Sequence, residues 1–312
     1  MDYLWGLVAC VLMAYIFIEM NAVNSLLRVR SRMISSLFLL LMTACGFLHP
    51  FHTGLLVSLA VLIAIYFLFR TYDASYPQLP TFHAFLFFSL GSVLWPPLLL
   101  LIPLMLWNQG VFMRSLSLKT FGAAILGLLL PYMFLAVAIL TMNDVLHIDE
   151  LRMMNDEYSV QSSFINHHSS IIIPPRGITG GLDTPFSLSS LPRIEDFLSY
   201  APLPPGRAGQ GVLAALVFLL LLGLTGFIHY IRKSYDDKIH VRMKFYSLLA
   251  FQVATTLWLV LQPQHFYDLF PLCLITTGPA AAHFFTFART LLSTIWCSLL
   301  TIALIAIAIL NL

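Results

Sequence analysis

Charged residues are scarce in this sequence. Asp, Glu, Lys and Arg make up only 10% of the 312 residues, whereas soluble domains carry about 25%. The formal net charge is +2 and no basic cluster is interleaved with aromatic residues, so no nucleic-acid partner is expected. With 59% hydrophobic residues and a mean hydropathy of +0.88, the chain holds more apolar side chains than a water-soluble core needs. The composition therefore predicts an integral membrane protein in contact with membrane lipids.

Motifs for catalysis, cofactors and metals are also missing. The four cysteines lie in apolar stretches without CxxC spacing: Cys10, Cys45, Cys273 and Cys297. Neither a disulfide framework nor a zinc site is implied by such a pattern. The sequence contains no Walker motif, GxGxxG, GxSxG or redox motif. We therefore expect no metal and no cofactor, and a non-enzymatic role is favoured while enzymatic activity stays open.

Long apolar runs are what the sequence has in abundance. Several reach the roughly 17–25 residues that cross a bilayer as a helix, the structure that satisfies backbone hydrogen bonds within lipid. The first run lacks a basic leading region and a small-residue cleavage site, so we expect a retained span rather than a signal peptide. The predicted spans are 3–20, 34–48, 54–69, a contested stretch 79–112, 121–142, 211–231, 245–261, 266–285 and 291–310.

The contested stretch contains "SLGSVLWPPLLLLIPLMLW", from Ser89 to Trp107. If it were one span, the Lys and Arg residues would divide evenly, eight on each side. If the chain turns at Trp95-Pro96-Pro97, twelve share one side and four lie in a long outer loop, as the preference of Lys and Arg for the cytoplasm favours. Pro96 and Pro97 also remove amide donors and disfavour helix before them. The alternatives are two short spans or a re-entrant hairpin, packed in the interior of the bundle.

The resulting fold class is an all-α polytopic membrane protein with about ten spans and both termini extracytoplasmic. Residues 1–142 form an N-terminal membrane bundle of about six crossings, and residues 211–312 a C-terminal bundle of about four. Between them, residues 143–210 form a large extracytoplasmic loop with eight acids, four bases and seven prolines. This composition favours extended and turn structure.

Glu19 is an acid inside the first predicted span, 3–20. An ionisable group in lipid is costly and by default a functional hypothesis. A structural role is favoured here, in which Glu19 either extends to the membrane surface or pairs with Arg28. If the broken span lines a transport path, Gly91, Pro96 and Pro97 are its candidate residues, because discontinuous helices form such paths in transporters.

The outer loop offers a second set of candidates. Arg176 and Arg193 could hold a diphosphate through bidentate hydrogen bonds. Asp149 or Glu150 could then serve as a general base. The alternative is an ordinary loop in which neighbouring acids balance the arginines.

Several stretches of the first 140 residues carry a family resemblance. They are the segment Asn24–Arg32 after a span, the "LFR" of Leu68–Arg70, the proline-bearing broken span, and "RSLSLKT" followed by "LLPY". In these features the chain resembles an uncharacterised family of multi-pass inner-membrane proteins from Bacteroidetes. The resemblance implies a bacterial inner-membrane location and no mechanism.

Three functions are compatible with these observations. The first is a non-enzymatic component or scaffold of bacterial envelope biogenesis that works through a protein partner in the inner membrane. The second is a transferase, like a polymerase or ligase, that acts on polyprenyl-linked sugars at the outer face. The third is a transporter or lipid-handling protein.

Overall fold

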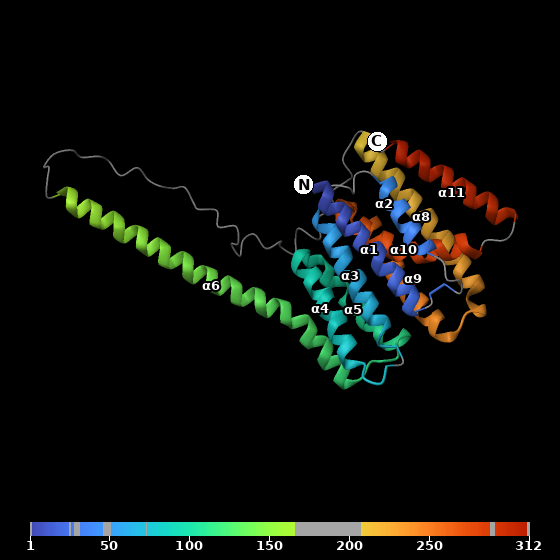
Figure 1. Cartoon of the computed structure of the whole chain (residues 1–312), viewed down its shortest axis with the longest axis horizontal. Coiled ribbons are helices and arrows are strands. Elements are labelled where there is room, and N and C mark those ends of the chain that lie inside the picture. The colour runs from blue at the N-terminus through green and yellow to red at the C-terminus, as the bar shows by residue number, and fades with distance from the viewer. Residues whose placement is uncertain are drawn as a thin grey trace. The chain divides into compact units, whose positions relative to one another are not determined.

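A computed structural model describes residues 2–24, 26–27, 32–45, 51–72, 74–165, 207–287 and 291–310. Every regular element in these ranges is helical (Figure 1). The α-helices are α1 (Asp2–Asn24), α2 (Met33–Ala44), α3 (Thr53–Phe69), α4 (Gln78–Leu94), α5 (Ile102–Trp107), α6 (Leu118–Ile165), α8 (Arg207–Lys233), α9 (Ile239–Leu261), α10 (Phe266–Phe287) and α11 (Leu291–Leu310). The chain divides into two compact units, Met1–Leu129 with Ser199–Leu312, and Leu130–Leu198.

Five helical segments among the described residues are long and apolar enough to cross a membrane. They are Tyr3–Asn24, Leu118–Thr141, Gly211–Asp236, Ile239–Leu261 and Pro263–Phe287. Shorter apolar helical segments are Met33–Ala44, Thr53–Phe69, Gln78–Leu94, Pro96–Phe112 and Thr294–Ala306. The prediction of an all-α integral membrane protein is confirmed at this level.

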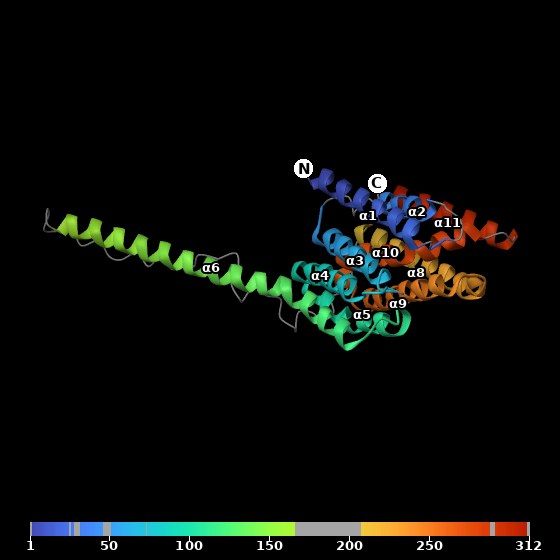
Figure 2. The same cartoon turned by 60° about the horizontal axis from the view of Figure 1, so that its bottom comes forward.

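Helix α10 forms the centre of the larger unit. Every residue from 269 to 284 is buried. Of the residues in the most apolar 18-residue stretch of this segment, 89% are buried. Helices α2, α3, α8 and α9 pack around it (Figures 1 and 2). A helix that is surrounded in this way has no polar face to direct towards water, which explains why its apolar residues have no single-sided pattern.

Two glycines let α8 approach its neighbours closely, Gly226 the central helix α10 and Gly223 the helix α9. A methyl group added at Gly226 would lie 2.7 Å from the carbonyl carbon of Ala280, and one at Gly223 would collide with the amide of Gln252. Small residues at helix contacts are typical of membrane bundles, because packing rather than a hydrophobic driving force holds helices together in lipid.

The chain reverses direction at Trp95. Helix α4 ends at Leu94, Trp95 is extended with φ −141° and ψ 92°, and a 3₁₀ helix runs from Pro96 to Leu101. The side chain of Gln109 donates a hydrogen bond of 3.0 Å to the hydroxyl of Thr81. Thr81 and Gln109 lie symmetrically about Trp95, so the two arms form an antiparallel hairpin. The predicted break at Trp95-Pro96-Pro97 is confirmed.

The predicted position of this hairpin in the interior of the bundle is wrong. Leu90 on the first arm is 48% exposed, and Leu100 and Trp107 on the second are 66% and 61% exposed. Both arms bury one face and present the other outward, because the interior is already filled by α10. Apolar side chains on such an outward face are suited to lipid.

The predicted outer loop is also partly wrong, because α6 continues through residues 143–165 as helix. The sequence between Pro131 and Pro174 contains neither proline nor glycine, so nothing in it interrupts the helix. All seven prolines of the expected loop lie from Pro174 onwards. Residues 166–206 are outside the described part of the chain.

Candidate functional site at the basic end

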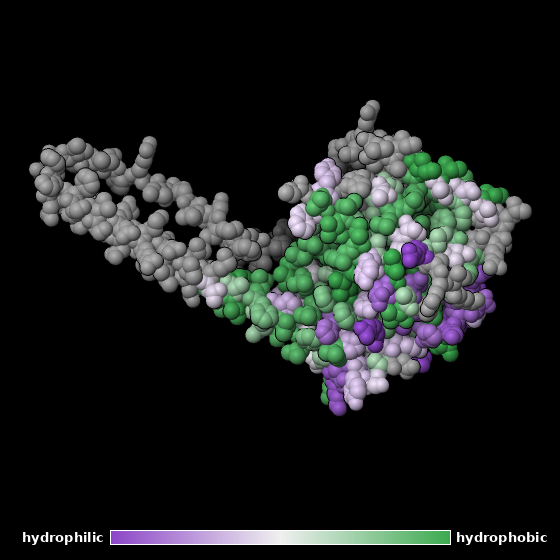
Figure 3. Space-filling view, in the orientation of Figure 1, coloured by the Kyte–Doolittle hydropathy of each residue, from purple (hydrophilic) through white to green (hydrophobic). Residues whose placement is uncertain are grey.

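Hydrophilic residues gather at one end of the larger unit (Figure 3). Contacts between helix ends define this basic end: α1, α3, α8 and α10 finish there, and α9 begins there. Exposed Lys and Arg residues lie at the ends of these helices and in the segments that follow them along the chain. They are Arg32, Arg70, Arg114, Lys119, Arg232, Lys233 and Lys238. The basic end therefore has a positive surface.

Lys244 is a cation buried beneath this surface, with 8% of its area exposed. Its ammonium group donates a hydrogen bond of 2.8 Å to the side-chain oxygen of Asn24, and it lies 5.8 Å from the ring centroid of Tyr72. The contact joins α9 to the end of α1 and to the residues that follow α3. Among the described residues, no carboxylate lies within ion-pair distance of Lys244. Its charge is therefore offset only by an amide dipole and an aromatic face.

His283 and Asp237 form a second buried contact. The Nε2 atom of His283 lies 4.0 Å from a carboxylate oxygen of Asp237, and only 4% of each side chain is exposed. Aromatic rings of Tyr230, Phe245 and Phe287 lie within 4.7 to 5.6 Å of the imidazole centroid. A protonated imidazole would form an ion pair with the carboxylate, and the contact ties the end of α10 to the residues that follow α8.

A polar cavity of about 580 Å³ lies at the same end. Its lining residues come from the turn between α3 and α4 and from the segment before α6: Thr71, Tyr72, Ala74, Ser75, Pro77, Met113, Arg114 and Ser115. The hydroxyl of Ser115 donates a hydrogen bond of 3.1 Å to that of Thr71, which joins the two walls. The exposed side chains of Ser75 and Arg114 open the cavity to the surface.

Arg114 has an unusual backbone conformation. Its φ of 51° is the one positive φ of a non-glycine residue in the described ranges. Two hydrogen bonds surround it, from the amide of Met113 to Asn108 and from the amide of Ser115 to Gln109. This pattern caps the end of a helix, a position that strongly favours glycine.

Polar side chains at the opposite end are tied to neighbouring helices. The ring of His52 lies 3.1 Å from the carbonyl of Tyr267, and the hydroxyl of Thr53 donates to the carboxylate of Asp268. Trp95, at the tip of the hairpin, stacks on Trp258 with ring centroids 5.2 Å apart. These contacts join the beginning of α3 to the beginning of α10, and the tip of the hairpin to the end of α9.

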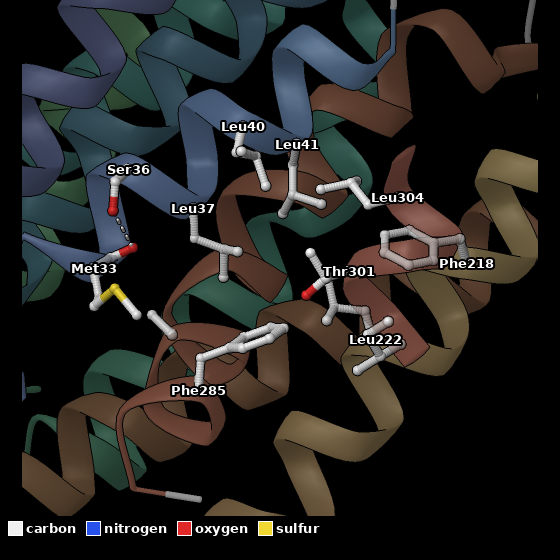
Figure 4. Close-up of a pocket in the computed structure, with 12 residues that line it drawn as sticks. Met33, Ser36, Leu37, Leu40, Leu41, Phe218, Leu222, Phe285, Thr301 and Leu304 are labelled. Carbon is white, nitrogen blue, oxygen red and sulfur yellow. Dashed lines mark hydrogen bonds between the residues drawn. The ribbon is translucent and has the colours of Figure 1, made fainter. Parts of the chain in front are cut away.

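An apolar groove of about 240 Å³ lies between α2, α8, α10 and α11 (Figure 4). Leucine and phenylalanine side chains from these helices point into it, among them Leu37, Phe218 and Phe285. Its two hydroxyls, of Ser36 and Thr301, both donate to backbone carbonyls of their own helices. The groove therefore offers an apolar wall to whatever enters it, as an acyl chain requires.

Of the ionisable side chains predicted for a site, only that of Glu19 falls in the described part of the chain. Glu19 is exposed on α1. Asp149 and Glu150 lie on α6 in the smaller unit, and their side chains are outside the described part, as are Arg176 and Arg193 entirely. Their proposed roles stay predictions.

The broken-span residues take part in packing. Gly91 is buried, and a methyl group added there would lie 3.1 Å from Leu98 and 3.3 Å from Ala60. Pro97 is buried and Pro96 half-buried where the hairpin turns. The polar cavity lies at the other end of the hairpin.

Sequence reasoning missed Lys244 because it placed the beginning of this span at Phe245. Helix α9 begins at Ile239 instead, so Lys244 lies in its second turn. A cation so close to an apolar run was the available signal, since such residues are rare inside spans.

No group of three or more His, Cys, Asp or Glu side chains in the described ranges is arranged to hold a metal ion. The fold and its polar contacts define the chain as an α-helical integral membrane protein. Comparison with known protein families, characterised proteins and solved structures finds no match for the chain.

Proposed function

We propose that the chain is a non-enzymatic component of a bacterial envelope assembly and acts through a protein partner in the inner membrane. The observation that supports this proposal is the use of the buried polar side chains. Four of them connect one helix or segment to another: Lys244 to Asn24, Gln109 to Thr81, Ser115 to Thr71, and Ser89 to the carbonyl of Leu128. Polar groups used in this way stabilise a rigid bundle.

The proposed topology has about ten crossings. Helix α4 contains 17 residues, as many as α3, and spans about 25 Å at 1.5 Å per residue. The returning arm, Pro96–Phe112, runs back to the level of Thr81. These lengths favour two full crossings over a shallow re-entrant loop. The beginning of α1 and the end of α11 lie near each other (Figures 1 and 2), as an even number of crossings requires.

The orientation follows from charge. The basic end gathers exposed Lys and Arg residues, which favour the cytoplasmic side in short loops. Both termini are then extracytoplasmic. Cysteine-accessibility labelling in intact cells tests this assignment: Ser75→Cys should be protected from an impermeant maleimide, whereas Phe51→Cys should react. The reverse pattern would contradict the proposed orientation.

Native mass spectrometry after gentle extraction from the membrane tests the scaffold proposal. We expect a second protein at fixed stoichiometry with the chain. Detection of the chain alone, or bound to lipid only, would contradict the proposal. A retained polyprenyl phosphate would favour the transferase alternative, and the double substitution Arg176→Ala/Arg193→Ala should then abolish its retention.

Lipid handling is the second candidate, and the apolar groove of Figure 4 favours it. In that case the extracted protein would carry one lipid at fixed stoichiometry. Leu37→Trp would fill the groove and displace the lipid, whereas Leu12→Trp, on an exposed face of α1, would leave it bound.

A further inference from the structure

We infer that the polar cavity at the basic end binds a phosphate group, with Arg114 as its main ligand. This inference is independent of the proposed scaffold role. Among its described lining residues, the cavity presents two exposed donors, the guanidinium of Arg114 and the hydroxyl of Ser75. The hydroxyls of Ser115 and Thr71 hold its wall together, since Ser115 donates to Thr71 and Thr71 donates to the carbonyl of Leu68. Guanidinium and hydroxyl groups are donors that recognise phosphate oxygens, and the planar guanidinium can bind two of them at once.

The backbone of Arg114 provides a second argument. A left-handed residue with a side chain is strained, and glycine would adopt the same conformation at lower cost. The sequence nevertheless places there the residue best suited to grip phosphate. Backbone strain of this kind is concentrated at ligand-binding sites, where the surrounding structure holds it in place. The side chain of Arg114 is exposed at the mouth of the cavity and is available to a ligand.

The third argument is the buried charge behind the cavity wall. Tyr72 lines the cavity, and the ammonium of Lys244 lies 5.8 Å from the centroid of its ring. The ammonium has three N–H groups, and one of them donates a hydrogen bond to Asn24. Because no described carboxylate neutralises Lys244, an anion in the cavity would lower the cost of burying this charge.

The phosphate could belong to the headgroup of a membrane lipid or to a soluble anion. Both present the same oxygens to Arg114, and the basic end attracts both. Thermal unfolding of the purified protein in neutral detergent distinguishes them, since a ligand that binds only the folded state raises the melting temperature. The probes are a phosphatidylglycerol, a diacylglycerol with the same acyl chains, and inorganic phosphate.

Three variants separate the charge of Arg114 from its strain. Arg114→Ala removes the charge and keeps the strained backbone, whereas Arg114→Gly removes both. Arg232→Ala removes an exposed arginine from the same end without touching the cavity. All three lose one positive charge, so a general effect of surface charge would appear equally in each.

We expect phosphatidylglycerol to raise the melting temperature of the natural protein and of Arg232→Ala, while diacylglycerol does not. In both Arg114 variants, the half-saturating concentration should rise about 10–100-fold, as loss of charge-assisted hydrogen bonds predicts. Without ligand, Arg114→Gly should melt roughly 1–3 °C higher than Arg114→Ala. A matching response to inorganic phosphate would support the site and identify a soluble source.

Four results would overturn the inference. They are no response to either phosphate probe, an equal response to diacylglycerol, full binding by Arg114→Ala, and an equal loss of binding in Arg232→Ala. A lower melting temperature for Arg114→Gly than for Arg114→Ala would overturn the argument from strain.

Discussion

Helices α8 and α10 pack against each other but differ in how much of their surface is covered by protein. Of the five long apolar segments, the one that contains α8 has the highest mean hydropathy. Only 50% of the residues in its most apolar stretch are buried. The segment that contains α10 has the lowest mean hydropathy, and 89% of the residues in its most apolar stretch are buried. The central helix of this bundle is thus less apolar than a helix that reaches its surface.

The physical reason lies in what surrounds each helix. A side chain that faces lipid meets no hydrogen-bond partner, so the outward positions of α8 must be apolar, as Leu213, Val217 and Leu224 are. Helix α10 meets protein on all sides, and its Thr276 and His283 find partners on α9 and beyond α8. Burial in protein is what permits polarity inside the membrane.

The largest expected effect comes from forcing the two helices apart. Gly226→Leu would place a side chain against the backbone of Ala280 and Ala281, which cannot move without displacing α10. We expect a loss of stability above about 4 kcal/mol, which is exceptional for one substitution. The folded fraction after detergent extraction, measured by size-exclusion chromatography, should collapse. Gly122→Leu is the control, because nothing lies within 4 Å of a methyl group at Gly122.

A cavity on the central helix should cost more than the same truncation on the surface of α8. Leu274→Ala removes a side chain that is 1% exposed, whereas Leu224→Ala trims one that is 56% exposed. We expect a loss of about 2–3 kcal/mol for the first and little change for the second. Unfolding in a graded denaturing detergent measures both, and equal losses would refute the central position of α10.

The buried cation at the basic end comes next in size. Lys244→Ala leaves the side chain of Asn24 without its donor and should cost about 1–2 kcal/mol. Lys233→Ala, on the exposed end of α8, should change stability by less than about 0.5 kcal/mol. Thermal unfolding of the two variants in the same detergent compares them. An unchanged melting temperature for Lys244→Ala would show that the contact stabilises nothing.

The smallest effect is expected from the hydroxyls between α9 and α10. Thr276 and Thr255 lie 3.4 Å apart, and each also donates to its own helix backbone. Thr276→Val should therefore cost only about 0.6 kcal/mol, a common value for such contacts in lipid. A double-mutant cycle with Thr255→Val measures the coupling. A coupling above about 2 kcal/mol would mean that polar pairing, and not packing, holds α10 in place.

Much of the fold was predictable because membrane helices follow from apolar length. The predicted spans 54–69 and 266–285 correspond to α3 and α10 within one or two residues, and the break at Trp95 follows from Pro96 and Pro97. The helical extension of α6 was missed because prolines and glycines beyond Pro174 were averaged over the whole expected loop. The candidate site was not predicted, since Tyr72, Arg114 and Lys244 are far apart in the chain.

The sequence by itself determined that the chain is helical, that it enters a membrane, and where one long stretch turns back. These properties depend on local composition, because lipid requires each span to satisfy its own backbone. Only the tertiary structure decided which helix is central, that the hairpin presents one face outward, and that a buried lysine lies behind a polar cavity. Those properties depend on contacts between distant segments, which no local pattern of residues encodes.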